Sequence, residues 1–406
     1  MTDPTPEPRP EAIELPLWKR LLFGSVLLGL AAVVFEGAAQ VYMRTARGYT
    51  GGEFLQYEFD PYKNIGLARN WVDGRGVVTH NAQGFREVED VSREKPEGTF
   101  RVFLMGASTA YGLGGLFTHL QTEYAFLDNS ETIDAYLEPM LEQALPYERV
   151  EVINAAVPSI WTHHHLINLN QTILGYDPDL ILFLDGWNDH YFFDRSHDQF
   201  ASYSQGEQAQ GIMGPPTLSS LIRANGWWLF RKSAFVHVAV RAAQDARTAL
   251  FGGGGPAPIQ VEQAVEDLQW VFERNALKMI ERNALLLRHE GIPAIFMLQP
   301  VLILERHNLG LMPDIEQRLF DYMVGWQGNY EEFMLRVTPM IADRIEETVR
   351  PLGGRFLDLT VIHDGYQGQV FTDYAHLTPE GNRILAEIVA KEIVALVAES
   401  LPPNAP

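Results

Sequence analysis

Two kinds of apolar pattern alternate along the middle and the C-terminal part of the chain. Short runs of apolar or β-branched residues, typical of buried strands, lie at 101–105, 150–154, 180–185, 294–299 and 355–359. Longer segments with helical periodicity lie at 131–145, 162–174, 261–290, 330–349 and 379–399. Strands that alternate with helices predict an α/β fold with a doubly wound parallel sheet.

The last helical segment has a recognisable start. Thr378 can cap it, and Pro379 fits the first helical position, where its missing N–H costs nothing. We therefore expect a C-terminal helix that begins at Pro379.

A different pattern stands near the N-terminus, where residues 21–35 carry no charge. If Glu36 lies near the far interface, the apolar run extends to Met43, and a helix from Leu21 would be about 34 Å long, enough to cross a bilayer. Trp18, Lys19 and Arg20 precede it, as an interfacial aromatic residue and a positive flank would. We predict a transmembrane signal anchor at 17–43, a cytoplasmic tail at 1–16, and the rest of the chain in the periplasm or outside the cell.

Two other interpretations of this segment remain open. It could be a cleaved signal peptide with the small residues 37–39 at the cleavage site, or a core helix. Arg44 and Arg47 follow the run and blur the charge asymmetry that sets orientation. Residues 44–100 are rich in turn-forming residues and are interpreted as a stem and lead-in that packs on the following domain.

Residues 190–260 interrupt the alternation of strands and helices. They contain an aromatic cluster at 227–235 and a glycine run at 252–255 that is followed by Pro256 and Pro258, which is typical of a flexible connector. We interpret the segment as an insertion after the third strand, either a cap near the site or a helical pair that covers the sheet.

Composition narrows the classes of function. With 406 residues, 46% of them hydrophobic, the chain can bury a large core. Its net charge of -21 repels phosphate backbones and anionic lipid head groups, so neither nucleic-acid binding nor electrostatic membrane docking is expected. The absence of cysteine excludes disulfides, thiolate metal sites and a cysteine nucleophile.

Candidate catalytic residues follow the predicted strands or precede the last helix. Ser108 follows the first strand and Asn188 the third, and Asp373 and His376 precede the C-terminal helix. Because parallel strands place their carboxyl ends at one edge, these side chains should meet there. They supply a nucleophile, an oxyanion donor and a base with its orienting acid, and the backbone N–H groups of Ser108 and Ser159 could donate further hydrogen bonds.

Each residue alone has an ordinary structural explanation. Ser108 could cap a short helix, Asn188 could form an Asx-turn, and an exposed histidine near an aspartate is usually idle. It is the occurrence of all four motifs in one order that favours an esterase site.

We expect neither a metal nor a cofactor. His163, His164 and His165 are adjacent on a helix and cannot all face one metal ion, so a solvated or pocket-rim position is expected for them. The glycines at 112, 114 and 115 lack the spacing of a dinucleotide-binding motif. Asp185 and Asp189 are expected to be structural hydrogen-bond partners.

The four motifs resemble those of SGNH hydrolases, also called GDSL-type esterases or lipases. Ser108 matches the nucleophile, Asn188 in Gly-Trp-Asn-Asp matches the oxyanion asparagine, and Asp373 and His376 match the Asp-x-x-His pair. Residues 81–86 and 95–101 resemble the lead-in of larger, often membrane-anchored bacterial members. Two positions depart from the family pattern: Ala107 replaces the aspartate of Gly-Asp-Ser, and Ser159 stands where a glycine is expected.

The resemblance implies a flavodoxin-like hydrolase domain at 101–399 with an insertion at about 190–260. It also implies ester hydrolysis through an acyl-serine, with an O-acyl or acetyl group on a cell-envelope or secreted polysaccharide as the substrate suggested by analogy. Two alternatives stay open, namely transfer of the acyl group to a sugar hydroxyl and a catalytically silent carbohydrate-binding protein on the same fold.

Overall fold

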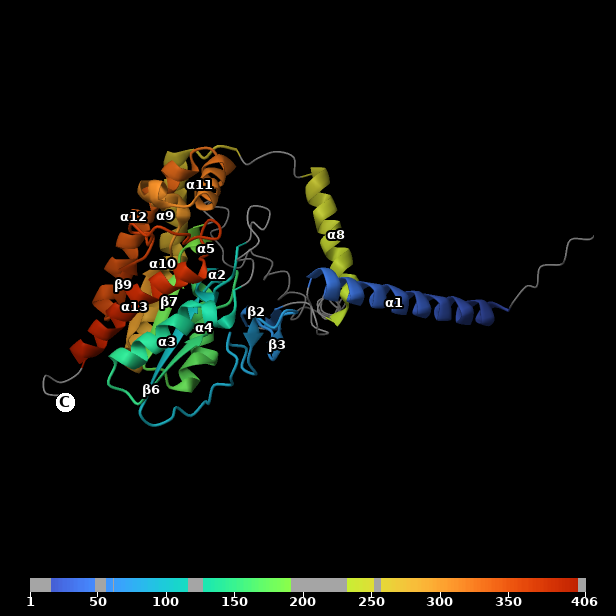
Figure 1. The fold of residues 1–406 in the computed structure, drawn as a ribbon, viewed down its shortest axis with the longest axis horizontal. Helices are drawn as coiled ribbons and strands as arrows, with labels where there is room; N and C mark the ends of the chain where they lie inside the picture. The colour runs from blue at the N-terminus through green and yellow to red at the C-terminus, as the bar shows by residue number, and fades with distance from the viewer. Residues whose placement is uncertain are drawn as a thin grey trace, which may run out of the picture.

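The computed structural model describes residues 16–47, 56–60, 62–115, 127–190, 232–251 and 257–400. Its main body is a five-stranded sheet with helices on both faces, and a long N-terminal helix projects from this body (Figure 1). The α/β fold predicted from the sequence is confirmed.

The five strands are all parallel and follow the order β6-β5-β7-β8-β9. If the strands of this sheet are counted along the chain, the order is 2-1-3-4-5, the flavodoxin-like arrangement. The strands are β5 (Thr99–Gly106), β6 (Arg149–Asn154), β7 (Leu180–Asp185), β8 (Ala294–Leu298) and β9 (Arg355–Asp358). All eight residues of β5 are buried, as expected for a central strand covered on both faces.

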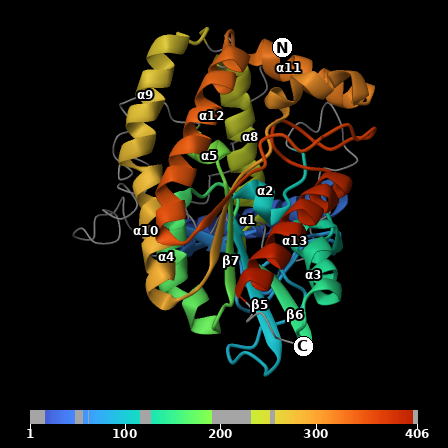
Figure 2. The ribbon, with the colours of Figure 1, turned by 90° about the vertical axis from the view of Figure 1, so that its left-hand side faces the viewer.

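Helices cover the sheet in two layers (Figure 2). On one face α3 (Ile133–Ala144) packs against α13 (Pro379–Ser400). On the other face α10 (Ala276–Glu290) packs between α4 (Thr162–Gln171) and α12 (Tyr330–Val349). The hydroxyl of Thr378 accepts a hydrogen bond from the N–H of Gly381 at 3.1 Å, so Thr378 caps α13 as predicted.

Several elements differ from the prediction. The periodic segment 261–290 forms two helices, α9 (Val261–Arg274) and α10, because Asn275 leaves helical geometry with φ -116° and ψ -84°. Helix α11 (Asp314–Trp326) was not predicted. The short helices are α2 (Ser108–Tyr111), α5 (Trp187–His190), η1 (Asn129–Glu131), η2 (Ile173–Tyr176), η5 (Leu302–Leu311) and η6 (Arg350–Leu352).

The N-terminal helix α1 spans Leu17–Arg47. Within it, Leu17–Thr45 is long and apolar enough to cross a membrane, and its most apolar window is not buried against the rest of the protein. The signal anchor predicted at 17–43 falls on this helix, whereas residues 1–15 and 48–55 lie outside the described residues.

The insertion predicted at about 190–260 is described only in part. Residues 191–231 and 252–256 lie outside the described residues, so the role of the segment as a cap or as a cover for the sheet stays a prediction. Its described part is α8 (Ala234–Phe251), which packs against α1 (Figure 1).

The lead-in forms two antiparallel pairs, β1 (Tyr57–Asp60) with β2 (Asn64–Leu67) and β3 (Trp71–Val72) with β4 (Thr79–His80). After β4, the Asn81 side chain accepts hydrogen bonds from the N–H groups of Gln83 and Phe85 at 3.1 and 3.0 Å. The resulting turn presses Phe85 edge-on against Phe103 of β5, with ring centroids 5.6 Å apart. The lead-in is thereby joined to the central strand.

Arg86 follows this turn and is almost fully buried. Its guanidinium donates hydrogen bonds to the carbonyl oxygens of Tyr111 at 2.6 Å, Gly112 at 2.7 Å and Leu127 at 2.7 Å. The guanidinium carbon also lies 4.5 Å from the centre of the Tyr111 ring. These bonds satisfy the carbonyl groups that α2 leaves open at its C-terminal end. The conformation after Ser108 therefore depends on a residue of the lead-in.

We predict that Arg86→Met lowers the free energy of unfolding by about 3 kcal/mol or more, because it leaves several buried carbonyl groups without a donor. Chemical denaturation of the full chain in detergent measures this change. Arg69→Met is the matched control, since the Arg69 side chain is 64% exposed and forms a surface ion pair with Glu58. Equal losses in the two variants would contradict the bracing role of Arg86.

Candidate active site

Ser108 is the first residue of α2 and directly follows the sharp turn at the end of β5. The turn requires Gly106, whose φ is +157°, because a Cβ at this position would lie 2.3 Å from the carbonyl oxygen of Leu184 and 2.6 Å from Cβ of Ala110. Strand β7, which neighbours β5 in the sheet and contains Leu184, thus passes too close to position 106 for any side chain there. The turn holds Ser108, which is half-buried, at the carboxyl edge of the sheet.

The structure brings together three of the predicted site residues. Nε2 of His376 lies 2.8 Å from Oγ of Ser108. On the other side of the ring, Nδ1 lies 2.8 Å and 2.9 Å from the two carboxylate oxygens of Asp373. Asp373 also accepts the N–H groups of Ala375 and His376 at 3.1 and 3.0 Å, so its carboxylate is fixed by its own turn. The Ser108 hydroxyl, the His376 imidazole and the buried Asp373 carboxylate thus form one connected series of hydrogen bonds.

The segment 359–378, which carries Asp373 and His376, is held by two buried glutamates. The Glu305 carboxylate accepts the N–H groups of residues 362 and 363 at 2.6 and 3.0 Å. The Glu316 carboxylate accepts those of residues 370 and 371 at 3.2 and 2.7 Å. Both side chains are inaccessible to solvent. Neither glutamate was singled out in the sequence, because acidic residues outside the predicted strands and helices look like surface positions.

A buried amide connects three loops of the site. Gln299 donates from Nε2 to the Thr109 hydroxyl at 3.0 Å and accepts the N–H of Trp187 at 3.2 Å. The Thr109 hydroxyl in turn donates to the carbonyl of Ala375 at 3.1 Å. The neighbours of Ser108, Asn188 and His376 are thereby joined. A polar residue at the end of the apolar run 294–299 is the signal in the sequence that could have revealed this role.

Two of the three predicted oxyanion donors, Asn188 in α5 and Ser159 in the loop after β6, lie on segments that contact each other. Nδ2 of Asn188 donates to the carbonyl of Ile160 at 2.7 Å. This bond uses one amide hydrogen and fixes the side chain, and the second hydrogen can serve a ligand. Ser159, directly before Ile160, is exposed and has φ +67°. It adopts the left-handed conformation that favours glycine, the residue expected here from the family pattern.

Asn154, at the end of β6, supports the nucleophile turn from the other side. Its buried amide donates to the carbonyl of Ala110 in α2 at 3.1 Å and to the carboxylate of Asp134 at 2.6 Å. Burial raises the pKa of Asp134 to about 6. The N–H of Asn154 also donates to Glu87 at 2.8 Å, next to Arg86 of the lead-in.

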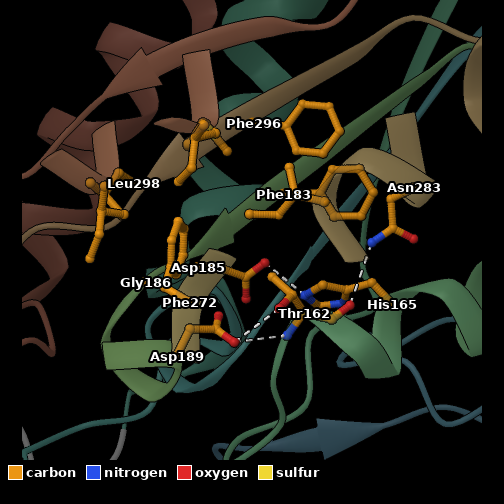
Figure 3. A pocket seen from close by; sticks show the side chains of 14 residues that line it. Thr162, His165, Phe183, Asp185, Gly186, Asp189, Phe272, Asn283, Phe296 and Leu298 are labelled. Atoms are coloured by element: carbon orange, nitrogen blue, oxygen red, sulfur yellow. Dashed lines mark hydrogen bonds and ion pairs between the residues drawn. The ribbon is translucent and has the colours of Figure 1, made fainter. Parts of the chain in front are cut away.

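A cavity of about 20 Å³ lies beside the loop that carries Asn188 (Figure 3). This volume corresponds to about one water molecule, so the cavity is too small for an acyl chain or a sugar. In its wall, Nε2 of His165 lies 2.7 Å from Asp185, and the Thr162 hydroxyl donates to Asp189 at 2.9 Å. Asp185 and Asp189 are thus hydrogen-bond partners, as predicted, in a polar cluster next to α5, the short helix that carries Asn188.

Two of the three adjacent histidines lie together: the ring centroids of His163 and His164 are 3.8 Å apart beside Trp161, whereas His165 lines the cavity. His165 is buried in the cavity wall, His164 is buried beside Trp161, and burial lowers the pKa of His164 to about 2 and that of His163 to about 4. Of the solvated or pocket-rim position expected for these histidines, the solvated alternative is wrong for the buried His164 and His165, while His165 does line the cavity. Among the described residues, no group of three or more histidine, aspartate or glutamate side chains could hold a metal ion.

Comparison with known proteins gives remote similarities only. No family model matches the chain, and no curated protein matches it. Among solved structures, the acetylxylan esterase Axe2 of Geobacillus stearothermophilus is 12% identical, with 72% of this chain and 94% of that chain covered and a TM-score of 0.36. The lipase/acylhydrolase of Enterococcus faecalis is 15% identical, with 76% and 100% covered and a TM-score of 0.33. Similarity at this level carries no argument about function, which has to come from the site.

The polar cluster beside α5 leads to a prediction about how the stability of the protein depends on pH. Burial, together with the neighbouring charge of Asp185, raises the pKa of Asp189 from 3.8 to about 7. Between these two pH values the folded protein keeps a proton that the unfolded chain releases, so this group makes the protein less stable as pH rises. Asp189→Asn removes the titration and keeps the oxygen that accepts from Thr162.

We therefore expect the melting temperature of Asp189→Asn, relative to that of the unsubstituted protein, to increase as pH is raised from 5 to 8. Thermal melts at several pH values check this. Asp343→Asn, at an exposed position of α12, controls for a change of carboxylate to amide at the surface. A difference that shrinks with rising pH would contradict the assignment.

Proposed function

We propose that the protein is a serine esterase of the SGNH type. The observation that carries this proposal is the 2.8 Å contact between Oγ of Ser108 and Nε2 of His376, with Asp373 bound to the opposite nitrogen of the same ring. This arrangement activates a hydroxyl for attack on a carbonyl carbon. The order of the motifs along the chain supports the same family.

In the acylation step, Oγ of Ser108 attacks the ester carbonyl and its proton passes to Nε2 of His376. Asp373 stabilises the imidazolium and keeps the ring in the orientation that accepts this proton. Negative charge develops on the carbonyl oxygen, where the N–H groups of Ser108 and Ser159 and the amide of Asn188 can donate. When the tetrahedral adduct collapses, the alcohol leaves with the proton from His376, and the acyl group stays on Ser108.

In the deacylation step, His376 takes a proton from water while the water oxygen attacks the acyl carbon. Collapse of the second adduct returns the proton to Ser108 and releases the carboxylic acid. If a sugar hydroxyl takes the place of water, the same steps transfer the acyl group to the sugar. Hydrolysis and transfer thus differ only in the acceptor.

We further propose that α1 anchors the enzyme in a membrane, with the catalytic domain in the periplasm or outside the cell. The apolar stretch Leu17–Thr45 supports a span, and Lys19 and Arg20 support a cytoplasmic N-terminus. An acyl or acetyl ester on a cell-envelope or secreted polysaccharide is the substrate class that suits this position.

A silent carbohydrate-binding protein on the same fold is the rival from another class. Such a protein would have no need for a serine and an imidazole at 2.8 Å, nor for a carboxylate held at zero exposure behind the imidazole. A buried carboxylate is costly unless it is paired, and here one of its partners is the imidazole that ester hydrolysis requires. The site therefore favours catalysis.

We predict that Ser108→Ala abolishes turnover of p-nitrophenyl acetate by several orders of magnitude, since triad members act as a unit. The full chain in detergent should also be labelled by a fluorophosphonate, and the label should be absent from Ser108→Ala. Because Ser108 is a small, half-buried residue, the melting curve should stay unchanged.

An unsubstituted protein that neither turns over the ester nor takes up the label would favour the silent binder. Labelling without hydrolysis, with acyl transfer once a sugar acceptor is added, would make the protein an O-acyltransferase.

A second prediction separates the two side chains near the oxyanion. Asn188→Ala should lower kcat by roughly 10²–10³-fold with little change in KM, because its amide serves charge that develops in the transition state. Ser159→Gly keeps the backbone N–H and suits φ +67°, so it should keep activity and raise stability by up to about 1 kcal/mol. A loss of activity in Ser159→Gly as large as that in Asn188→Ala would contradict these roles.

A further inference from the structure

The carboxylate of Glu36 joins two helices that lie far apart in the sequence. Glu36 belongs to α1, and its oxygens accept the hydroxyl of Ser233 at 2.6 Å and the N–H groups of Ala234 and Phe235 at 2.9 and 3.1 Å. These groups form the N-terminal end of α8, where a helix has open N–H groups and a positive dipole. A charge in an apolar helix is costly unless it is paired, and α8 provides the pairing.

Apolar packing continues the contact between α1 and α8. Ala39 and Met43 of α1 form a small buried cluster with Ala234, and Val238 packs against it. Beside this cluster the rings of Phe35 and Phe235 lie 5.4 Å apart. Helix α8 therefore meets the last part of α1, and Figure 1 shows that it turns away from the axis of α1 instead of running alongside it.

The length of α1 places this contact at a particular depth. With 31 residues the helix is about 46 Å long, whereas the hydrocarbon core of a bilayer is about 30 Å thick. If the core begins at Leu21, directly after Lys19 and Arg20, about 20 residues span it and the far boundary lies near Gln40. The segment 36–43 that contacts α8 then lies at this far boundary, where the hydrocarbon core meets the lipid head groups.

Most of the exposed positions in the first turns of α8 are apolar. Phe235 and Val240 are 44% and 38% exposed, Ala239, Ala242 and Ala243 are exposed beside them, and Arg241 is an exposed charged residue among them. Through the contact of Phe35 with Phe235, this surface continues the exposed apolar surface of α1. A surface of this kind outside a membrane would need another cover.

We propose that α8 lies along the outer surface of the membrane, with Phe235 and Val240 in the lipid interface and Glu36 fixing it to the span. An interfacial helix that runs across a spanning helix gives the enzyme a second, lateral attachment. The inference rests on the proposed span of α1 and is independent of the proposed esterase activity.

Because the chain has no cysteine, single introduced cysteines can carry a probe without background. We would label Phe235→Cys and Val240→Cys in the full chain with an environment-sensitive fluorophore and reconstitute it in phosphatidylcholine vesicles. Leu28→Cys, in the middle of the apolar run, reports on the span, and Leu335→Cys, at a position of α12 that is 49% exposed, reports on the body of the protein. Phosphatidylcholine spin-labelled near the head group or deep in the acyl chain quenches probes at the corresponding depth.

We expect the probes at 235 and 240 to be quenched about two-fold or more by the shallow spin label, the probe at 28 by the deep label, and the probe at 335 by neither. Quenching at 28 with water-exposed probes at 235 and 240 would overturn the position of α8 and leave the span intact. Probes at 235 and 240 that are shielded from water but not quenched by lipid would mean that protein covers α8, which also overturns it. No quenching at 28 would remove both the span and the interfacial helix.

The role of Glu36 can be tested separately by pairing Ala39→Cys with Ala234→Cys, which lie in the shared cluster. Disulfide formation between them should be efficient in the native sequence. It should fall several-fold in Glu36→Leu and recover in Glu36→Gln, which keeps an oxygen for the N–H groups of α8. Equal cross-linking in all three would show that Glu36 does not hold α8.

Discussion

One imidazole ring has to be held between a serine and a carboxylate, and most of the scaffold around the site serves this constraint. His376 contacts Ser108 on one side and Asp373 on the other, yet it stands on a segment of about twenty residues with little regular structure. Such a segment would sample many conformations, each residue costing about 1–2 kcal/mol to fix. Glu305 and Glu316 counter this freedom by accepting two N–H groups each.

The strands and the catalytic motifs could be predicted from the sequence because both are local patterns. An apolar run such as 180–185 identifies a buried strand by itself, and its parallel neighbours bring Ser108 and the loop of Asn188 to one edge. The connections across the site could not be predicted in this way. Arg86 binds backbone carbonyl groups of a distant segment, and these acceptors leave no mark on the composition of that segment. Gln299 is visible as a polar residue that ends an apolar run, but its backbone partner on a distant loop carries no such mark.

The helices illustrate the same limit. The segment 261–290 has one continuous helical periodicity, but the helix is interrupted at Asn275, where the hydrophobic pattern gives no sign of an interruption. Helix α8 lies in a segment interpreted as an insertion after the third strand, either a cap near the site or a helical pair that covers the sheet. Its contact with α1 includes the bonds of Glu36 to its first N–H groups, which the sequence pattern did not indicate. Glu36, a charged residue within an otherwise apolar segment, is thus part of the contact between α1 and α8.

A single device recurs through the molecule: one carboxylate accepts two neighbouring backbone N–H groups. Glu305 and Glu316 bind the segment 359–378 in this way. Asp73 binds two N–H groups of the lead-in, and Glu36 binds two at the start of α8. Charge-assisted bonds of this kind are stronger than neutral ones, so a few acids can order long stretches of irregular backbone. The net charge of -21 is therefore not only a property of the surface. Part of the acidic composition is internal, and it holds in place the segments on which the site and the contact between α1 and α8 depend.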